Sequence, residues 1–247
     1  MDRQALLGLN HFKNKDGILV IEAPTSQKAN EITSEILQKY SDQKTALFLS
    51  GGKTPIKLYE AIASDKTLKA GAVLMVDERY GQKLHKHRNE LIIKSTGLLK
   101  YCEEQNIRFY PILQEDLDLA DTALQYDESL RFILKYFPKS VGILGIGSDS
   151  HTVGIPAIPK IAKQILENQS LLVTYYEDES GVYGARVTMT FLALTQLDLI
   201  LLLVLGQEKR EALKLMFNDG PIEEVPARFY LKPEIAEKVI LITDQII

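Results

Sequence analysis

The sequence predicts an α/β fold in which helices cover both faces of a doubly wound, largely parallel sheet. Short apolar runs rich in Val, Ile and Leu alternate along the chain with longer segments whose apolar residues recur at helical spacing. Most of the short runs are continuously apolar, as expected of strands that helices cover on both faces. In such a sheet, ligands bind beyond the carboxyl ends of the strands.

The predicted elements alternate regularly. A strand over residues 17–21 precedes an amphipathic helix over 26–43, and a strand over 45–49 precedes a helix from Thr54 to about Ser64. Another amphipathic helix covers 119–137. The remaining predicted strands are the apolar runs 72–76, 107–112, 141–144, 171–175, 199–205 and 239–242. No linker rich in Pro, Gly or Ser divides the sequence, so we expect residues 1–247 to form a single Rossmann-like, three-layer domain.

Composition and charge narrow the class of protein. Hydrophobic residues make up 45% of the chain and charged residues 25%, as in an ordinary soluble protein. The formal net charge of −4 gives no electrostatic reason to expect nucleic acid or an anionic membrane as a partner. The single cysteine, Cys102, excludes an internal disulfide and a thiolate metal cluster. The first residues lead into no long apolar segment, and the run 197–205 is too short to span a bilayer. We therefore expect a cytoplasmic protein, either a monomer or a small homo-oligomer.

The most informative segment follows the strand 141–144 and has the sequence Gly-Ile-Gly-Ser-Asp-Ser-His-Thr, residues 145–152. Glycines let the backbone approach a ligand closely and adopt positive φ. A histidine at the carboxyl end of a strand lies where open α/β sheets bind ligands, and imidazole can take and return a proton near neutral pH. The alternative is a histidine without a catalytic role, whose hydrogen bonds are made within a surface turn. This alternative explains the glycines less well. We therefore predict an enzyme whose base is His151.

A second segment, Ser50-Gly51-Gly52-Lys53-Thr54-Pro55, follows the strand 45–49. Thr54 is expected as the N-cap of the next helix and Pro55 as its first residue. The glycines would then leave backbone N–H groups and the positive end of the helix facing outward, which is how helix N-termini hold phosphate. The alternative is a tight turn without a ligand. Neither a Walker loop nor a dinucleotide fingerprint is present, since the spacing of both motifs is absent.

Charged residues follow two further strands. Asp77-Glu78-Arg79-Tyr80 comes after the strand 72–76 and forms either a solvated loop or a carboxylate and a guanidinium placed over the cleft. Lys209 lies just inside the start of a helix, where a cation opposes the macrodipole, so an anionic ligand or a surface carboxylate is needed to explain it. Asn89 is a candidate N-cap for a helix over 90–98.

Taken together, these segments resemble the family that joins 6-phosphogluconolactonases with glucosamine-6-phosphate deaminases. The resemblance covers residues 51–209 and consists of six motifs in family order: S-G-G-K-T-P, D-E-R-Y, H-R-N-E, G-I-G-S-D-S-H-T, R-V-T and G-Q-E-K. The deaminases have an acid a few residues beyond the histidine, whereas Thr152-Val153-Gly154-Ile155-Pro156-Ala157 contains none. They also tend to have tyrosine at the position of Arg79. Both differences favour the lactonase branch.

The lactonase branch implies hydrolysis of 6-phospho-D-glucono-1,5-lactone to 6-phosphogluconate, a step of the pentose phosphate pathway. His151 would take a proton from the attacking water and return it to the leaving ring oxygen, while Asp149 orients the imidazole. Arg79 would stabilise the oxyanion or hold the sugar or phosphate, and Asp77 would order the cluster or bind sugar hydroxyls. The resemblance places the phosphate and sugar on Gly51, Gly52, Lys53, Thr54, Asn89, Arg186 and Lys209. No metal or cofactor is required.

Two departures from the family pattern concern this site. Ser150 replaces a glycine that usually precedes the histidine, and if the position requires positive φ, the resulting strain would displace His151. Lys53 replaces the customary serine of the phosphate loop, which removes a hydroxyl donor and adds a positive charge. Two alternatives therefore stay open: a deaminase or isomerase acting on an amino-sugar phosphate, and a non-catalytic sugar-phosphate sensor. A sensor would bind its ligand without His151 and show no turnover.

Overall fold

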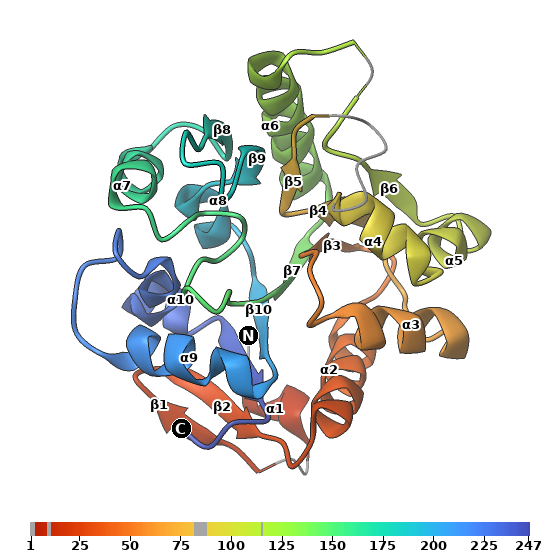
Figure 1. Cartoon of the computed structure of the whole chain (residues 1–247). Helices are drawn as coiled ribbons and strands as arrows, with labels where there is room; N and C mark the ends of the chain where they lie inside the picture. Colours follow the sequence, from red (N-terminus) through yellow and green to blue (C-terminus); the bar gives the residue numbers. More distant parts are fainter. Residues whose placement is uncertain (1–2, 9–10, 82–87, 115) are drawn as a thin grey trace.

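The computed structural model describes residues 3–8, 11–81, 88–114 and 116–247. Its centre is an eight-stranded sheet (Figure 1). The strands of this sheet are β1 (Lys13–Lys15), β2 (Ile18–Glu22), β3 (Thr45–Leu49), β4 (Ala72–Met75), β6 (Arg108–Tyr110), β7 (Lys139–Leu144), β10 (Leu199–Val204) and β11 (Val239–Thr243). They lie in the order β1-β2-β11-β10-β7-β3-β4-β6. β1 pairs antiparallel with β2, and the other neighbouring pairs are parallel. The predicted sheet is confirmed.

Helices lie on both sides of this sheet (Figure 1). They are α1 (Arg3–Leu7), α2 (Ser26–Tyr40), α3 (Ile56–Asp65), α4 (Asn89–Ser95), α5 (Leu98–Glu104), α6 (Leu119–Tyr136), α7 (Pro159–Glu167), α8 (Phe191–Thr195), α9 (Arg210–Phe217) and α10 (Pro233–Ala236), with the 3₁₀ segments η1 (Gln207–Lys209) and η2 (Pro226–Leu231). Every residue of β3, β10 and β11 is buried, which explains their continuously apolar sequences. In the described part of the chain, no helix is long and apolar enough to cross a membrane.

A second sheet was not predicted. It consists of β5 (Asp77–Arg79), β9 (Ala185–Met189) and β8 (Val173–Glu177), and both of its strand pairs are antiparallel. The strand expected over 171–175 therefore belongs to this sheet and not to the parallel one. Residues 77–79 of the D-E-R-Y segment form β5 and not a solvated loop, the first of the two alternatives, and Asp77 and Glu78 are both buried. Charged residues in a short strand conceal it from hydropathy patterns, and here ion pairing allows their burial.

Two helix starts differ from the predictions. α3 begins at Ile56, and the N-cap position is occupied by Pro55, so Thr54 is not the N-cap. Residues before Ile56 form a turn instead, in which the Ile56 N–H donates to the Lys53 carbonyl at 3.4 Å. Asn89 is the first residue of α4 and not its N-cap. The carboxylate of Glu78, from a different element, accepts from the N–H groups of Asn89 and Glu90 at 2.8 and 2.9 Å and takes the place of a cap.

The order of the strands locates the ligand crevice. From β3 the chain proceeds outward through β4 to β6, and β7, β10 and β11 lie on the other side of β3. The direction of winding therefore reverses between β3 and β7, and crevices at such reversals bind ligands in open α/β sheets. The S-G-G-K-T-P segment follows β3, and the segment containing His151 follows β7. Both segments thus meet at one crevice.

Candidate active site

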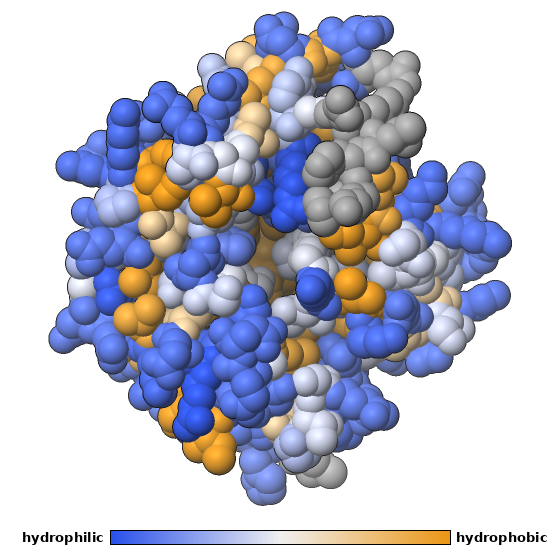
Figure 2. Space-filling view, viewed as in Figure 1, coloured by the Kyte–Doolittle hydropathy of each residue, from blue (hydrophilic) through white to orange (hydrophobic). Residues whose placement is uncertain are grey.

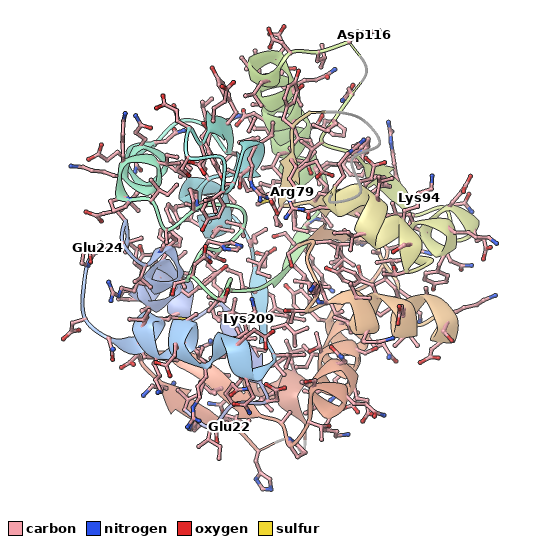
Figure 3. All side chains as sticks on the ribbon, viewed as in Figure 1. Glu22, Arg79, Lys94, Asp116, Lys209 and Glu224 are labelled. Atoms are coloured by element: carbon pink, nitrogen blue, oxygen red, sulfur yellow. The ribbon has the colours of Figure 1, made fainter. Side chains whose placement is uncertain are left out.

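A cavity of about 210 Å³ lies beyond the carboxyl ends of β3, β7 and β10. Figure 2 shows a central hollow bordered by hydrophilic residues on the face in view. Arg79 and Lys209 lie on opposite sides of this opening in Figure 3. Most of the predicted site residues line the cavity: Gly51, Gly52, Lys53, Thr54, Asp77, Arg79, Asn89, His151, Arg186 and Lys209.

The loop after β3 forms one wall of the cavity. The Ser50 N–H donates to the Ile143 carbonyl at 3.0 Å, and the buried Tyr59 hydroxyl donates to the Ser50 carbonyl at 2.9 Å. At Gly51, a Cβ atom would lie 2.1 Å from Oδ1 of Asn89, so a side chain does not fit there. Gly52 has a φ of +84°, which glycine adopts without strain. Gly51 is thus required by the close approach of Asn89, and Gly52 by its backbone conformation.

The charged strand β5 forms a second wall. Nη1 of Arg186 lies 3.0 Å from Oδ2 of Asp77, and both side chains are about nine-tenths buried. Arg79 and Arg186 are direct partners across the β5–β9 pair, where like charges destabilise the pairing. Burial and the nearby charge of Arg186 lower the pKa of the Arg79 guanidinium. An anionic ligand in the adjacent cavity would offset the repulsion between these two guanidinium groups.

Glu78 and Asn89 join this wall to α4. Glu78 is 1% exposed, and burial raises the pKa of its carboxyl even though three backbone N–H groups donate to it. The Asn89 Nδ2 group donates to the Asp77 carbonyl at 3.1 Å, which holds the amide against Gly51 and the cavity. Asn89 therefore lines the site and also begins a helix.

The loop after β7 carries an aspartate and a histidine in contact. Oδ1 of Asp149 lies 2.5 Å from Nδ1 of His151. At Gly147, a Cβ atom would lie 2.0 Å from the same imidazole nitrogen, so this glycine allows the ring to fold over the turn. Burial opposes the charged form of Asp149, but the hydrogen bonds and charge of His151 outweigh it and lower the pKa of the Asp149 carboxyl. An ionised carboxylate only accepts, so Nδ1 of His151 is the donor. Whenever the ring is neutral, the lone pair is therefore on Nε2.

Buried polar contacts support this loop from η2. The Ala227 N–H donates to the Ser150 carbonyl at 3.2 Å, and the Tyr230 hydroxyl lies 2.6 Å from Oγ1 of Thr152. Thr152 in turn donates to the Gly145 carbonyl at 2.9 Å. Ser150 has a φ of +70°, as suspected from its replacement of a glycine. His151 nevertheless contacts Asp149 and lines the cavity, so the expected displacement is not seen.

The cavity has an excess of positive charge. Lys53, Arg79, Arg186 and Lys209 line it, and Asp77, paired with Arg186, is the carboxylate among the described lining residues. Lys209 lies at the end of η1, after Gly206, whose N–H donates to Asp244 at 3.0 Å. The described residues include no group of three or more His, Cys, Asp or Glu side chains that could hold a metal ion. The arrangement suits an anionic organic ligand.

The structure brings together the site residues predicted from all six motifs. Asp149 does not line the cavity but reaches it through His151. His87, the first residue of the H-R-N-E motif, lies outside the described residues. Sequence reasoning missed Tyr183, whose hydroxyl donates to Oδ2 of Asp149. It lies between two glycines in a polar stretch, and nothing in that pattern points to Asp149.

Comparisons with known proteins show the family of the chain. The family described as glucosamine-6-phosphate isomerases/6-phosphogluconolactonase matches residues 22–240, and the chain belongs to this family. A 6-phosphogluconolactonase from Nostoc sp. is 31% identical over 189 residues, which cover 73% of this chain and 75% of the relative. A 6-phosphogluconolactonase from Xylella fastidiosa is 26% identical over 215 residues, with 84% of both chains covered.

Solved structures show the same fold. The crystal structure of 6-phosphogluconolactonase from Thermotoga maritima superposes with a TM-score of 0.70 and 25% identity, covering 92% of this chain and 98% of the other. The 6-phosphogluconolactonase from Plasmodium vivax gives a TM-score of 0.74 at 20% identity, covering 94% of this chain and 92% of the other. The three-layer α/β fold predicted from the sequence is therefore confirmed.

Proposed function

We propose that this protein hydrolyses 6-phospho-D-glucono-1,5-lactone to 6-phosphogluconate, with His151 as the general base. The observation that carries the proposal is the Asp149–His151 pair at the edge of a cavity that four cationic side chains line. The pair supplies acid–base chemistry, and the cations supply binding for a phosphate. The similarity to proteins named 6-phosphogluconolactonase supports the same substrate.

The reaction begins with deprotonation of water. Nδ1 of His151 donates to Asp149, which leaves Nε2 to accept a proton as the water oxygen attacks the lactone carbonyl carbon. The resulting tetrahedral oxyanion collapses, and the bond between the carbonyl carbon and the ring oxygen breaks. His151 then returns its proton to the ring oxygen, which becomes a hydroxyl group. Asp149 stabilises the imidazolium formed between these steps and keeps the ring in one tautomer.

The cationic residues divide between two tasks. Arg79 lines the same cavity as His151 and is the cross-strand partner of Arg186, so its guanidinium is suited to the oxyanion. The phosphate binds the loop of Gly51, Gly52, Lys53 and Thr54, with Arg186 and Lys209 as counter-charges. Asp77 holds Arg186 in place, and Asn89 contacts the sugar. Binding of the remote phosphate positions the lactone against His151.

The lactonase branch is favoured over the deaminase branch by the residues around His151. The turn that follows, Thr152 to Ile155, contains no acid, and its Gly154 packs against Asp77. Among the described residues, Asp149 is the carboxylate that contacts the imidazole, and Asp77, which lines the same cavity, pairs with Arg186. A separate acid for opening an amino-sugar ring is thus missing from the described site.

A coupled assay tests the proposal. Freshly generated lactone is supplied to the purified protein, and 6-phosphogluconate formation is followed through its dehydrogenase. Turnover above the spontaneous rate is expected with the lactone, and a separate assay of ammonia release should show no turnover of glucosamine 6-phosphate. Turnover of glucosamine 6-phosphate alone would establish the deaminase alternative instead. Binding of 6-phosphogluconate without turnover of either substrate would establish a sensor.

A further inference from the structure

The hairpin between β8 and β9 carries a tyrosine over the acid–base pair. The Tyr183 hydroxyl donates to Oδ2 of Asp149, the oxygen that His151 does not use. The Tyr183 and His151 rings meet edge to face, with centroids 5.8 Å apart and planes at 87°. Asp149 is therefore held from two sides, by a phenol on one oxygen and by an imidazole on the other.

Tyr183 is itself fixed by the hairpin. Its N–H donates to Oδ2 of Asp178 at 2.8 Å, and Asp178 also accepts from the Ser180 hydroxyl. Nε of Arg186 donates to the Tyr183 carbonyl at 3.2 Å, and the guanidinium lies 5.9 Å from the centre of the Tyr183 ring. Arg186 is buried and paired with Asp77. The backbone of Tyr183 is thus held on one side by the hairpin and on the other by Arg186, a residue of the cationic wall.

We propose that Tyr183 is a positioning residue that holds Asp149 in the orientation in which it locks the His151 tautomer. The side chains of Asp149 and His151 are 44% and 38% exposed, so solvent competes for both ends of their hydrogen bond. An exposed aspartate can rotate away from its partner unless its second oxygen is held. The Tyr183 hydroxyl holds that oxygen, and Oδ1 then faces Nδ1 of His151. The role in turnover rests on the proposed lactonase activity, whereas the tautomer lock does not.

The test combines NMR with kinetics on the full chain. In the neutral ring, the ¹⁵N shifts of Nδ1 and Nε2 of His151 are expected to lie far apart in the wild type, because one tautomer dominates. In Tyr183→Phe the two shifts should move toward each other as the tautomers mix. The kcat for the lactone should fall by roughly tenfold, since a hydrogen bond to a charged group is lost, while KM changes less than twofold. Tyr175→Phe, at an exposed position of β8, is the matched control and should leave both readouts unchanged.

A double variant distinguishes positioning from general stability. If Tyr183 acts through Asp149, adding Tyr183→Phe to Asp149→Asn should reduce kcat by less than twofold further. Unchanged ¹⁵N shifts in Tyr183→Phe, or fully additive losses in the double variant, would overturn the proposal. A wild type with separated ¹⁵N shifts and no lactone turnover would instead contradict the proposed function while leaving the tautomer lock supported.

Discussion

Replacement of Ser150 by glycine should stabilise the protein. Ser150 has a φ of +70° and is 1% exposed, and its hydroxyl has no hydrogen-bond partner among the described residues. Relief of the left-handed conformation is worth about 1–2 kcal/mol. Removal of a buried, unsatisfied hydroxyl is worth about 1–3 kcal/mol.

Two losses oppose this gain. Glycine increases the conformational entropy of the unfolded chain, at a cost of about 0.4–1 kcal/mol. The buried Cβ of Ser150 contributes about 0.8 kcal/mol of apolar burial, which is also lost. The net increase in the free energy of unfolding is therefore about 2 kcal/mol, which corresponds to a rise in Tm of roughly 4–8 °C for a chain of this size.

Urea and thermal unfolding of Ser150→Gly, followed by circular dichroism, measure this change. Ser150→Ala is the matched variant, because it removes the hydroxyl but keeps the Cβ atom and the backbone strain, so its gain of about 2 kcal/mol measures the hydroxyl contribution alone. Lactone turnover should persist in both variants, since His151 already faces Asp149 in the strained turn. A glycine variant no more stable than the wild type would refute the reasoning.

Three further predictions concern the site. Gly51→Ala places a Cβ atom 2.1 Å from the Asn89 amide, so isothermal calorimetry should show at least roughly tenfold weaker binding of 6-phosphogluconate, and unchanged affinity would contradict the close approach. In Arg186→Lys, the ammonium group cannot contact both the Asp77 carboxylate and the Tyr183 carbonyl as the guanidinium does. The KM for the lactone should therefore rise by roughly tenfold, and a wild-type KM would argue against a role of Arg186 in substrate binding. Because the pKa of Asp149 is lowered below its ordinary value of 3.8, its stabilising contribution is complete above that value and is lost as pH falls through the folded pKa. The difference in unfolding free energy between wild type and Asp149→Asn should thus be present at about pH 5 and shrink as the pH falls below about pH 4, and a difference that does not shrink there would contradict the sign.

Much of the parallel sheet could be predicted from the sequence because its strands are buried on both faces. The run 45–49 coincides with β3, and 199–205 and 239–242 differ from β10 and β11 by one residue at one end. Such strands need apolar residues at every position, so hydropathy alone identifies them. The second sheet could not be predicted from hydropathy. β5 is charged, and its burial depends on Arg186, a residue more than one hundred positions away, which no local pattern reveals.

In the site, too, local motifs reveal some residues, and only the fold reveals another. Glycine-containing turns after β3 and β7 pointed to the crevice because parallel strands bring their carboxyl ends to one edge. The family motif predicted that Asp149 orients His151 but left open whether the two side chains touch, and the structure shows them in contact. Tyr183 was not predicted, because its relation to Asp149 is created by the β8–β9 hairpin and leaves no periodicity or motif in the sequence.

Hydrolysis of 6-phospho-D-glucono-1,5-lactone by the wild type and by His151→Ala tests the central claim most directly. The account predicts turnover above the spontaneous rate in the wild type and a loss of roughly 10²–10⁴-fold in the variant, the range expected for a general base. Calorimetry should show that the variant still binds 6-phosphogluconate, because the phosphate loop and the cationic residues are intact. Turnover retained in a folded His151→Ala variant would contradict His151 as the base, and a folded wild type without turnover would contradict the lactonase itself.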